Sequence, residues 1–144
     1  MLIEGILSVL NLQTLLLITG GTLLGIIIGA IPGLTVTMGV ALFLPVTFAM
    51  SPVDGLSLLM GLYIGGTSGG LISAVLLKIP GTPSSIATTF DGHPMAARGE
   101  AGKALSVSIL ASFLGGTFSL LVLFFVAPRL AEVALQFGPY EYFA

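Results

Sequence analysis

Residues 31–37 read IPGLTVT and residues 79–85 read IPGTPSS, and each Pro-Gly motif closes a long apolar run. Proline removes a backbone donor and its ring clashes with the preceding turn, so we expect both helices to break at these motifs. In hydrocarbon every backbone polar group needs an internal partner, so a broken helix persists only where protein buries the break or the break lines a water-filled cavity. Two such breaks in one chain therefore predict a cavity.

The composition predicts a membrane protein. The 144-residue chain is 56% hydrophobic and 7% charged, whereas soluble domains carry about 25% charged residues. The net charge of -2 is spread without a basic stripe, which excludes a nucleic-acid partner. The chain has no cysteine, so neither a disulfide nor a cysteine metal site is expected. The lipid bilayer is the expected surrounding of this chain.

Three apolar segments are long enough to cross a bilayer, which takes about 20 mostly apolar residues. We expect spans at about residues 12–31, 56–79 and 104–127, with Pro128 stopping the third. Short amphipathic segments at the two ends of the chain, the second of them ending in a cluster of Phe and Tyr, are expected at the membrane interface.

The segments that follow the two breaks are expected to be broken or re-entrant helices. The first covers about residues 33–50, and it is apolar but only marginally long enough to cross. A loop at residues 51–55 is expected to follow it. The second covers about residues 82–95 and leads into a polar stretch at residues 91–103.

Two of the predicted spans carry small-residue faces. Gly21, Gly25 and Gly29 recur every four residues in the first span, which predicts close contact with another helix. The second span contains GGTSGG at residues 65–70, which is either a packing notch or an ion site lined by backbone. The residues of this possible site are Gly66, Thr67, Ser68 and Gly69.

Three ionisable residues near the second break each have two interpretations. Lys78 is expected to cap the end of its helix and extend toward the headgroups; the alternative is a pair with a substrate carboxylate. A turn closed by Asp-Gly is the simpler account of Asp91 and His93; the alternative is a proton relay or an ion site. No second His or Glu lies at ligand spacing, so no metal site is expected. No nucleophile and base are arranged as in an enzyme.

The polar residues after each break suit a helix N-terminus that faces a ligand. Thr82 is a good N-cap and Pro83 suits the first helical position. A helix N-terminus carries about half a positive charge and unpaired donors that bind carboxylates. Discontinuous helices hold anions and coupling ions in this way in secondary transporters; the alternative is a pair of kinks without a ligand. The predicted substrate or ion site consists of Pro32, Gly33, Thr35, Thr37, Pro80, Gly81, Thr82, Pro83, Ser84 and Ser85.

The same motifs carry a resemblance to a known family. Residues 32–105, which include IPGTPSSIATTFDGHPMA at 79–96, are followed by SFLGG at 112–116 and FGPYEYFA at 137–144. Together they resemble the large membrane subunit of the tripartite tricarboxylate transporter family, from about Gly25 to the last residue. The resemblance implies that the substrate region includes Pro32, Gly33, Thr35, Pro80, Gly81, Thr82, Pro83 and Ser84. Thr35 departs from the Gly or Ser that many relatives are expected to carry there.

The resemblance also implies a function. It implies a multi-pass secondary transporter of the bacterial inner membrane that imports citrate-like tricarboxylates or related organic anions by symport with an ion. The implied partners are a periplasmic solute-binding protein and a small membrane subunit. No cofactor is implied beyond the coupling ion, Na⁺ or H⁺.

The expected fold is an all-α, polytopic helical membrane protein with broken or re-entrant helices at the Pro-Gly motifs. Members of this family are several times longer, so residues 1–144 are expected to be a single transmembrane domain from the N-terminal part of a longer transporter. The alternative function is a non-transporting membrane scaffold, in which the glycine faces are oligomer contacts and the breaks are only kinks. Enzymatic activity is not expected.

Overall fold

A computed structural model of the chain describes residues 9–134, which form helices and the turns that join them. The elements are α2 (Leu12–Ala30), α3 (Val36–Thr47), α4 (Pro52–Leu77), the single 3-10 turn η1 (Pro83–Ser85), α5 (Ile86–Ala97) and α6 (Ala101–Ala134). The predicted all-α fold is confirmed. The interfacial segment expected at the N-terminus lies mostly outside the described residues, as does the Phe and Tyr cluster expected at the C-terminus.

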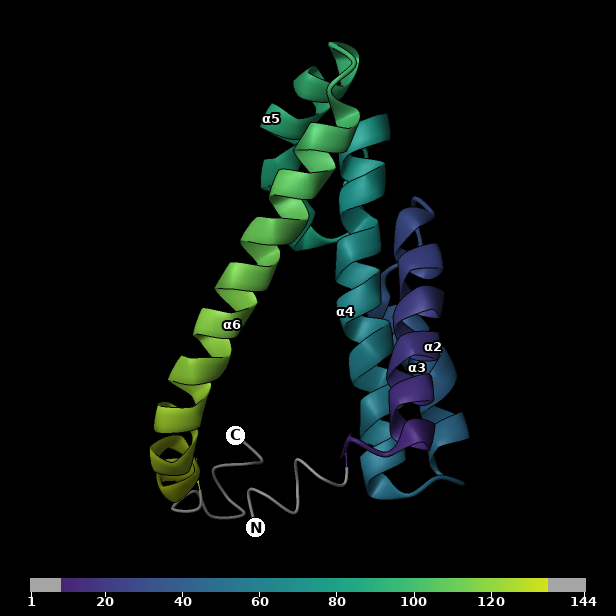
Figure 1. The fold of residues 1–144 in the computed structure, drawn as a ribbon, viewed down its shortest axis with the longest axis vertical. Coiled ribbons are helices and arrows are strands. Elements are labelled where there is room, and N and C mark those ends of the chain that lie inside the picture. The colour runs from purple at the N-terminus through teal and green to yellow at the C-terminus, as the bar shows by residue number, and fades with distance from the viewer. Residues whose placement is uncertain (1–8, 135–144) are drawn as a thin grey trace, which may run out of the picture. The chain divides into compact units, whose positions relative to one another are not determined.

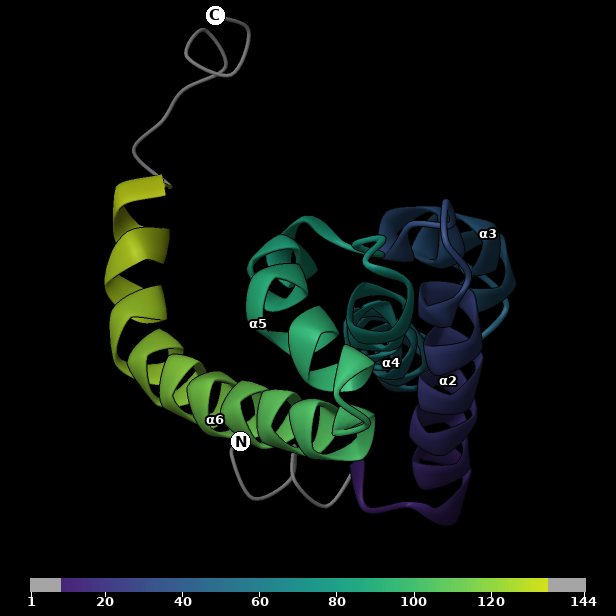
Figure 2. The ribbon, with the colours of Figure 1, turned by 90° about the horizontal axis from the view of Figure 1, so that it is seen from above.

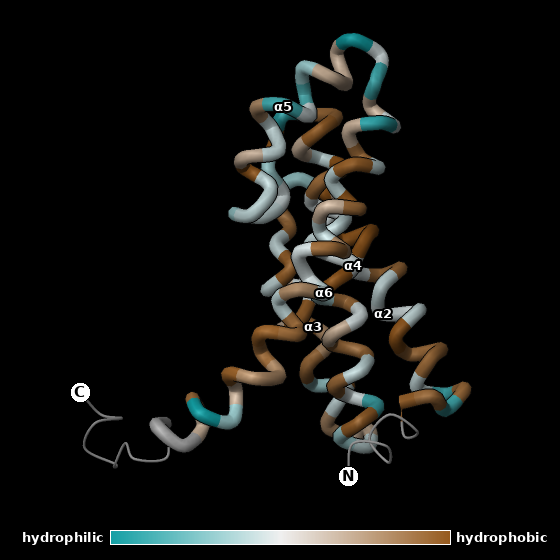
Figure 3. Tube along the Cα trace, turned by 60° about the vertical axis from the view of Figure 1, so that its left-hand side comes forward, coloured by the Kyte–Doolittle hydropathy of each residue, from teal (hydrophilic) through white to brown (hydrophobic). Residues whose placement is uncertain are grey.

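Three helices are long and apolar enough to cross a membrane: Leu12–Ala30, Pro52–Leu77 and Ala101–Ala131. They correspond to the three expected spans with shifted ends. Figure 3 shows that these helices are largely apolar and that hydrophilic residues gather where α5 leads into α6. The helices after the breaks, α3 and α5, are shorter, with 12 residues each, and their re-entry into a membrane stays a prediction.

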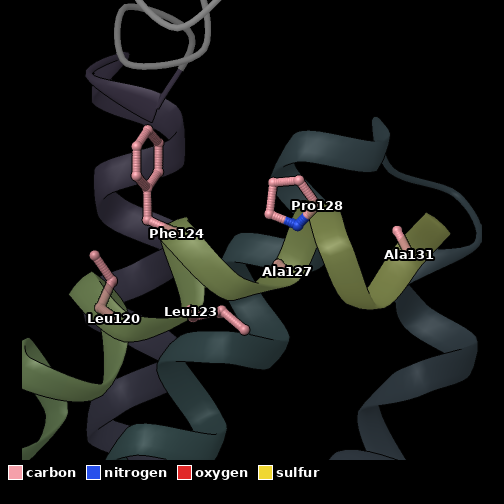
Figure 4. Close-up of a pocket in the computed structure, with 6 residues that line it drawn as sticks. All are labelled: Leu120, Leu123, Phe124, Ala127, Pro128 and Ala131. Carbon is pink, nitrogen blue, oxygen red and sulfur yellow. The ribbon is translucent and has the colours of Figure 1, made fainter. Parts of the chain in front are cut away.

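The chain divides into two compact units, Met1–Ser108 and Ile109–Ala144. In the first unit α4 is central, since it contacts α2, α3, η1 and α5, and its contact with α2 is the most extensive (Figures 1 and 2). The second unit contains most of α6. Along α6 an apolar pocket is lined by Leu120, Leu123, Phe124, Ala127, Pro128 and Ala131 (Figure 4).

Glycines on both helices let α2 and α4 approach each other closely. Gly25 is buried against α4, and a Cβ atom there would overlap the carbonyl oxygen of Leu62; Gly21 and Gly29 make equivalent contacts one turn away on each side. On α4, Gly65 is buried against the carbonyl oxygen of Thr22 in the same manner. The predicted helix contact of the Gly21, Gly25 and Gly29 face is confirmed.

The loop predicted at residues 51–55 is wrong, because α4 already begins at Pro52. The Ser51 side chain accepts a hydrogen bond from the Asp54 backbone N–H at 3.2 Å, and Pro52 occupies the first turn. Ser, Pro and Asp in this order also form a helix start signal, which here prevails over their turn preference. The Asp54 carboxylate accepts a hydrogen bond from the Thr14 hydroxyl at 2.8 Å, which ties the starts of α2 and α4 together.

Pro128 does not stop the third span, contrary to the prediction. The helix α6 continues through Pro128 to Ala134, and Figure 4 shows its ribbon on both sides of this residue. A proline inside a helix removes one hydrogen bond and displaces one carbonyl, and long apolar helices accommodate this by bending.

The Asp-Gly turn expected at Asp91 and Gly92 is also wrong, because both residues lie inside α5. The turn falls instead at Gly99, which has a φ of +83°. The Glu100 N–H donates to the Met95 carbonyl at 2.9 Å, as in a Schellman motif, where a glycine in the left-handed region ends the helix. A helix stop at Gly99 therefore prevails over the local turn preference of Asp-Gly.

Candidate functional site

The segments after the two Pro-Gly motifs meet at one pocket of about 250 Å³. The pocket lies within the first unit, where the start of α3, the middle of α4 and the start of η1 come together. Its lining residues are Thr35, Val36, Thr37, Tyr63, Thr67, Gly81, Thr82, Pro83 and Ser84. The structure thus brings together two segments that lie more than forty residues apart in the sequence.

At the first break a tight turn is followed directly by a capped helix. The Leu34 N–H donates to the Ile31 carbonyl at 3.2 Å, and Gly33 has a φ of +94°, as in a type II turn with proline at its second position. Thr35 is the N-cap of α3, and its side chain accepts a hydrogen bond from the Met38 N–H at 3.2 Å.

Beyond this cap, the first turn of α3 offers free donors. Among the described residues, the backbone N–H groups of Val36 and Thr37 donate no hydrogen bond. Both residues line the pocket. The N-terminus of α3 therefore presents unpaired N–H groups, and the positive end of its dipole, beside this pocket.

The second break begins where α4 ends. As the sequence predicts, Lys78 is the C-cap of α4; it is left-handed with a φ of 57°, and its N–H bonds to the Ser73 carbonyl. Gly81 follows in a confined place, because a Cβ atom there would lie 2.7 Å from the Gly70 Cα and 2.8 Å from the Gly29 carbonyl oxygen. The second break is thereby packed against both α2 and α4.

A compact hydrogen-bond network holds the turn after Gly81. The Thr82 N–H donates to the Ser85 hydroxyl at 3.2 Å, and that hydroxyl donates to the Thr82 carbonyl at 2.8 Å. The hydroxyls of Thr82 and Ser84 lie 3.0 Å apart, with either as donor. One of these two protons therefore remains free for a ligand in the pocket.

The predicted site residues fall into two groups. Those that line the pocket are Thr35, Thr37, Gly81, Thr82, Pro83 and Ser84. Those that do not line it are Pro32, Gly33, Pro80 and Ser85. Pro32 and Gly33 form the first turn, Pro80 is exposed before the second, and the fully buried Ser85 has its hydroxyl engaged within that turn. These four residues lie in or beside the two turns that position the pocket-lining residues.

The GGTSGG segment of α4 supports both breaks. A Cβ atom at Gly66 would lie 2.8 Å from the Val36 side chain, and one at Gly70 would lie 3.1 Å from the Thr82 side chain. Thr67 lines the pocket, with its hydroxyl donating to the Ile64 carbonyl at 2.9 Å. Gly69 is buried against α2, and Ser68 is half-buried and is not part of the lining. The glycines are packing contacts here, and ion binding by this segment stays a prediction.

Sequence reasoning missed Tyr63 and Val36, which also line the pocket. Tyr63 lies four residues before Thr67, and residues at this spacing share one face of a helix. This spacing was the available signal for Tyr63. Val36 offers no such signal, because an apolar residue among many others does not indicate a site.

The pocket is uncharged, and hydroxyl groups lie within a lining that is otherwise mostly apolar. Its lining contains the hydroxyls of four Thr residues, one Ser and one Tyr, and no ionisable residue other than that Tyr. An anion here would be bound by hydroxyl and backbone N–H donors and by the positive end of α3, the helix that begins at the pocket. A single carboxylate has the charge and the acceptor geometry that such a donor set fits.

Comparison with known proteins gives a family and one relative. Residues 15–144 match the profile of the family described as "Tripartite tricarboxylate transporter TctA family". The chain is 47% identical over 124 residues to the "Uncharacterized 52.8 kDa protein in TAR-I ttuC' 3'region" of Agrobacterium vitis. This alignment covers 86% of the chain and 25% of the relative, so the chain spans about a quarter of that protein. No solved structure matches the chain.

Proposed function

The chain belongs to the tripartite tricarboxylate transporter TctA family, and from that premise we propose that its pocket binds a carboxylate of an organic anion during transport. The family is one of transporters and not of enzymes, which confirms the expectation that the chain is not an enzyme. Its three candidate spans and its family together point to the membrane.

One observation carries the proposal: both Pro-Gly motifs contribute to a single uncharged pocket. If the two breaks were only kinks, nothing would require the hydroxyls of both segments and the N-terminus of α3 to meet at one place. Anion binding explains the meeting, because donors from two segments can surround one carboxylate. Neutral donors also leave the pocket without a fixed positive charge that would hold the anion too firmly for release.

The remaining parts of the function are proposed from the family description. We propose a subunit of a transporter in the bacterial inner membrane that works with a periplasmic solute-binding protein and a small membrane subunit. We propose a tricarboxylate such as citrate as the substrate and symport with Na⁺ or H⁺ as the driving process. A pocket of about 250 Å³ would receive one end of such a substrate, and the other carboxylates would bind elsewhere in the intact transporter.

The test is citrate uptake into proteoliposomes by the intact transporter. The double variant Thr82→Ala with Ser84→Ala removes the hydroxyl pair. Hydrogen bonds to charged groups contribute about 1.5–3 kcal/mol each, so the initial uptake rate at low citrate should fall about tenfold or more. The matched control is Thr19→Ala with Ser106→Ala, whose hydroxyls are exposed and bond only to carbonyls of their own helices.

The control variant should retain wild-type uptake. Both variants are first checked for insertion into the membrane and for a single peak in size-exclusion chromatography. Unchanged uptake in the pocket variant would contradict the proposal. It would favour the scaffold interpretation, especially if the variant kept its association with the other subunits.

A further inference from the structure

A second pocket, of about 330 Å³, lies between α5 and the beginning of α6, within the first unit. It shares no residue with the pocket beside α3 and η1 that is proposed to bind a substrate carboxylate, called the carboxylate pocket below. Its lining residues are Ala87, Thr88, Asp91, Gly92, Met95, Ala104, Val107 and Ser108. Five of these residues lie on α5 and three lie on α6. Both sets follow helical spacing, so each helix turns one face to the pocket.

The polar part of this lining consists of oxygen atoms. Asp91 supplies a carboxylate, and Thr88, one turn earlier on the same helix, supplies a hydroxyl. Ser108 supplies a second hydroxyl from α6. The remaining lining is apolar except for Gly92. Carboxylate and hydroxyl oxygens are ligands for hard cations.

The Asp91 carboxylate carries a negative charge that no described residue neutralises. The nearby Lys103 ammonium lies 3.7 Å from Glu100 instead, and within residues 9–134 Asp91 takes part in no ion pair or side-chain hydrogen bond. Asp91 faces residues of the first two turns of a helix that is long and apolar enough to span a membrane. Asp91 is itself exposed, so its carboxylate is accessible to a cation from outside the protein, and a carboxylate without a cationic partner attracts one.

Two neighbouring contacts fix the orientation of α5. A Cβ atom at Gly92 would lie 2.9 Å from the Val75 side chain, so this glycine allows α5 to pack closely against α4. The His93 Nδ1 lies 3.1 Å from the Val75 carbonyl oxygen, which can only accept, so Nδ1 carries the proton and donates. These contacts prevent rotation of α5 and keep Asp91 on the pocket side.

We propose that this pocket binds Na⁺, with the Asp91 carboxylate as the charged ligand and the hydroxyls of Thr88 and Ser108 as neutral ligands. One carboxylate balances one monovalent cation, whereas Ca²⁺ sites generally use several carboxylates. The inference goes beyond the proposed carboxylate pocket, since it assigns a ligand to a different set of residues. The two pockets are joined by a continuous segment, because η1 begins at the first pocket and leads directly into α5.

The test is the thermal unfolding midpoint of the purified intact transporter without citrate. NaCl is titrated against choline chloride at constant ionic strength, and a ligand that binds the folded state raises the midpoint. Asp91→Asn keeps the size of the side chain and removes its charge. Replacing residues that only support the metal ligands already weakens metal binding about 10–100-fold. The Na⁺ concentration that gives half of the full rise in the unfolding midpoint should therefore increase at least about tenfold in Asp91→Asn.

Glu100→Gln is the matched control, since Glu100 is an exposed carboxylate paired with Lys103, and it should keep the wild-type Na⁺ response. Thr88→Val with Ser108→Ala retains the charge and removes both hydroxyls, and should weaken Na⁺ binding even if Asp91→Asn fails to fold. Retention of the wild-type response in either pocket variant would overturn the proposal. The proposal would also be overturned if Na⁺ did not change the unfolding midpoint of the wild type. It would likewise be overturned if the midpoint changed with pH but not with Na⁺, and if Asp91→Asn abolished that change with pH.

The two pockets can be judged separately. The variant Thr82→Ala with Ser84→Ala should lose the rise in midpoint that citrate produces and keep the rise that Na⁺ produces. Asp91→Asn should keep a citrate response in choline chloride. A variant that loses the rise in midpoint with citrate but keeps the rise with Na⁺ is therefore changed at the carboxylate pocket and not at the Na⁺ pocket.

Discussion

The two Pro-Gly motifs have the same first three residues, yet their glycines serve different purposes. In IPGLTVT, at residues 31–37, Gly33 is exposed and has a φ of +94°, with no atom near its missing side chain. In IPGTPSS, at residues 79–85, Gly81 is buried against the backbones of α2 and α4. The first glycine provides a conformation and the second provides space. A shared motif thus predicts a break in both places without predicting how each break is held.

Because Gly81 is confined and Gly33 is not, we expect the largest loss of stability for Gly81→Ala. A methyl group there would lie 2.7 Å from the Gly70 Cα and 2.8 Å from the Gly29 carbonyl oxygen. These are backbone atoms that cannot move aside, and overpacking of this kind costs about 3 kcal/mol. We expect a lower yield of folded protein and a clearly lower thermal unfolding midpoint in detergent.

The control for Gly81→Ala is Gly102→Ala, at a helical position with no atom within 4 Å of the added methyl group. This change should leave the midpoint unchanged or raise it slightly, because alanine favours helix over glycine. A Gly81→Ala variant as stable as the control would show that the second break is not confined by backbone.

The second prediction concerns Ser85, whose hydroxyl bonds to both the N–H and the carbonyl of Thr82. Ser85 is fully buried, so Ser85→Ala would leave the Thr82 N–H without its partner. An unsatisfied buried donor costs about 1–3 kcal/mol. The same substitution at the exposed Ser106 should have almost no effect, and the two midpoints measured side by side test this contrast. Equal midpoints would contradict the proposed role of Ser85 in holding the second turn.

Gly33→Ala should have a smaller effect than either change at the second break. The methyl group meets no other atom, so the cost comes only from the left-handed backbone and is about 1–2 kcal/mol. Gly99→Ala is a matched comparison, since Gly99 has a φ of +83° and open space as well. Both variants should lower the unfolding midpoint by similar amounts, and a neutral result at Gly33 would mean that the first turn adopts another conformation.

The positions of the breaks could be predicted from the sequence, but their meeting could not. Proline acts on the residues next to it, so both helix ends follow from local chemistry. The meeting depends on Gly66 and Gly70, which seat Val36 and Thr82 against α4. Glycine spacing predicts that something packs closely, and only the three-dimensional structure identifies the partner.

The wrong predictions also share a physical cause. Residues Ser51 to Gly55 and the Asp91-Gly92 pair were assigned to a loop and a turn from their turn preferences, and both lie largely in helices. Asp and Gly have several local roles, and tertiary contacts decide among them. Asp54 bonds to Thr14 of α2, and Gly92 allows the contact with Val75 of α4.

The smallest effect is expected for Thr35→Ser at the first break. Serine retains the hydroxyl that accepts from the Met38 N–H and is as good an N-cap as threonine, so the unfolding midpoint should stay near the wild-type value. Thr35→Ala removes this acceptor and should cost about 1 kcal/mol. The pair therefore separates the hydroxyl of Thr35 from its methyl group. If citrate uptake falls in the alanine variant and not in the serine variant, the hydroxyl matters and the additional methyl group of Thr35 does not. If the two variants are equally stable, Thr35 does not cap α3, and the first break is held by its Pro-Gly turn alone.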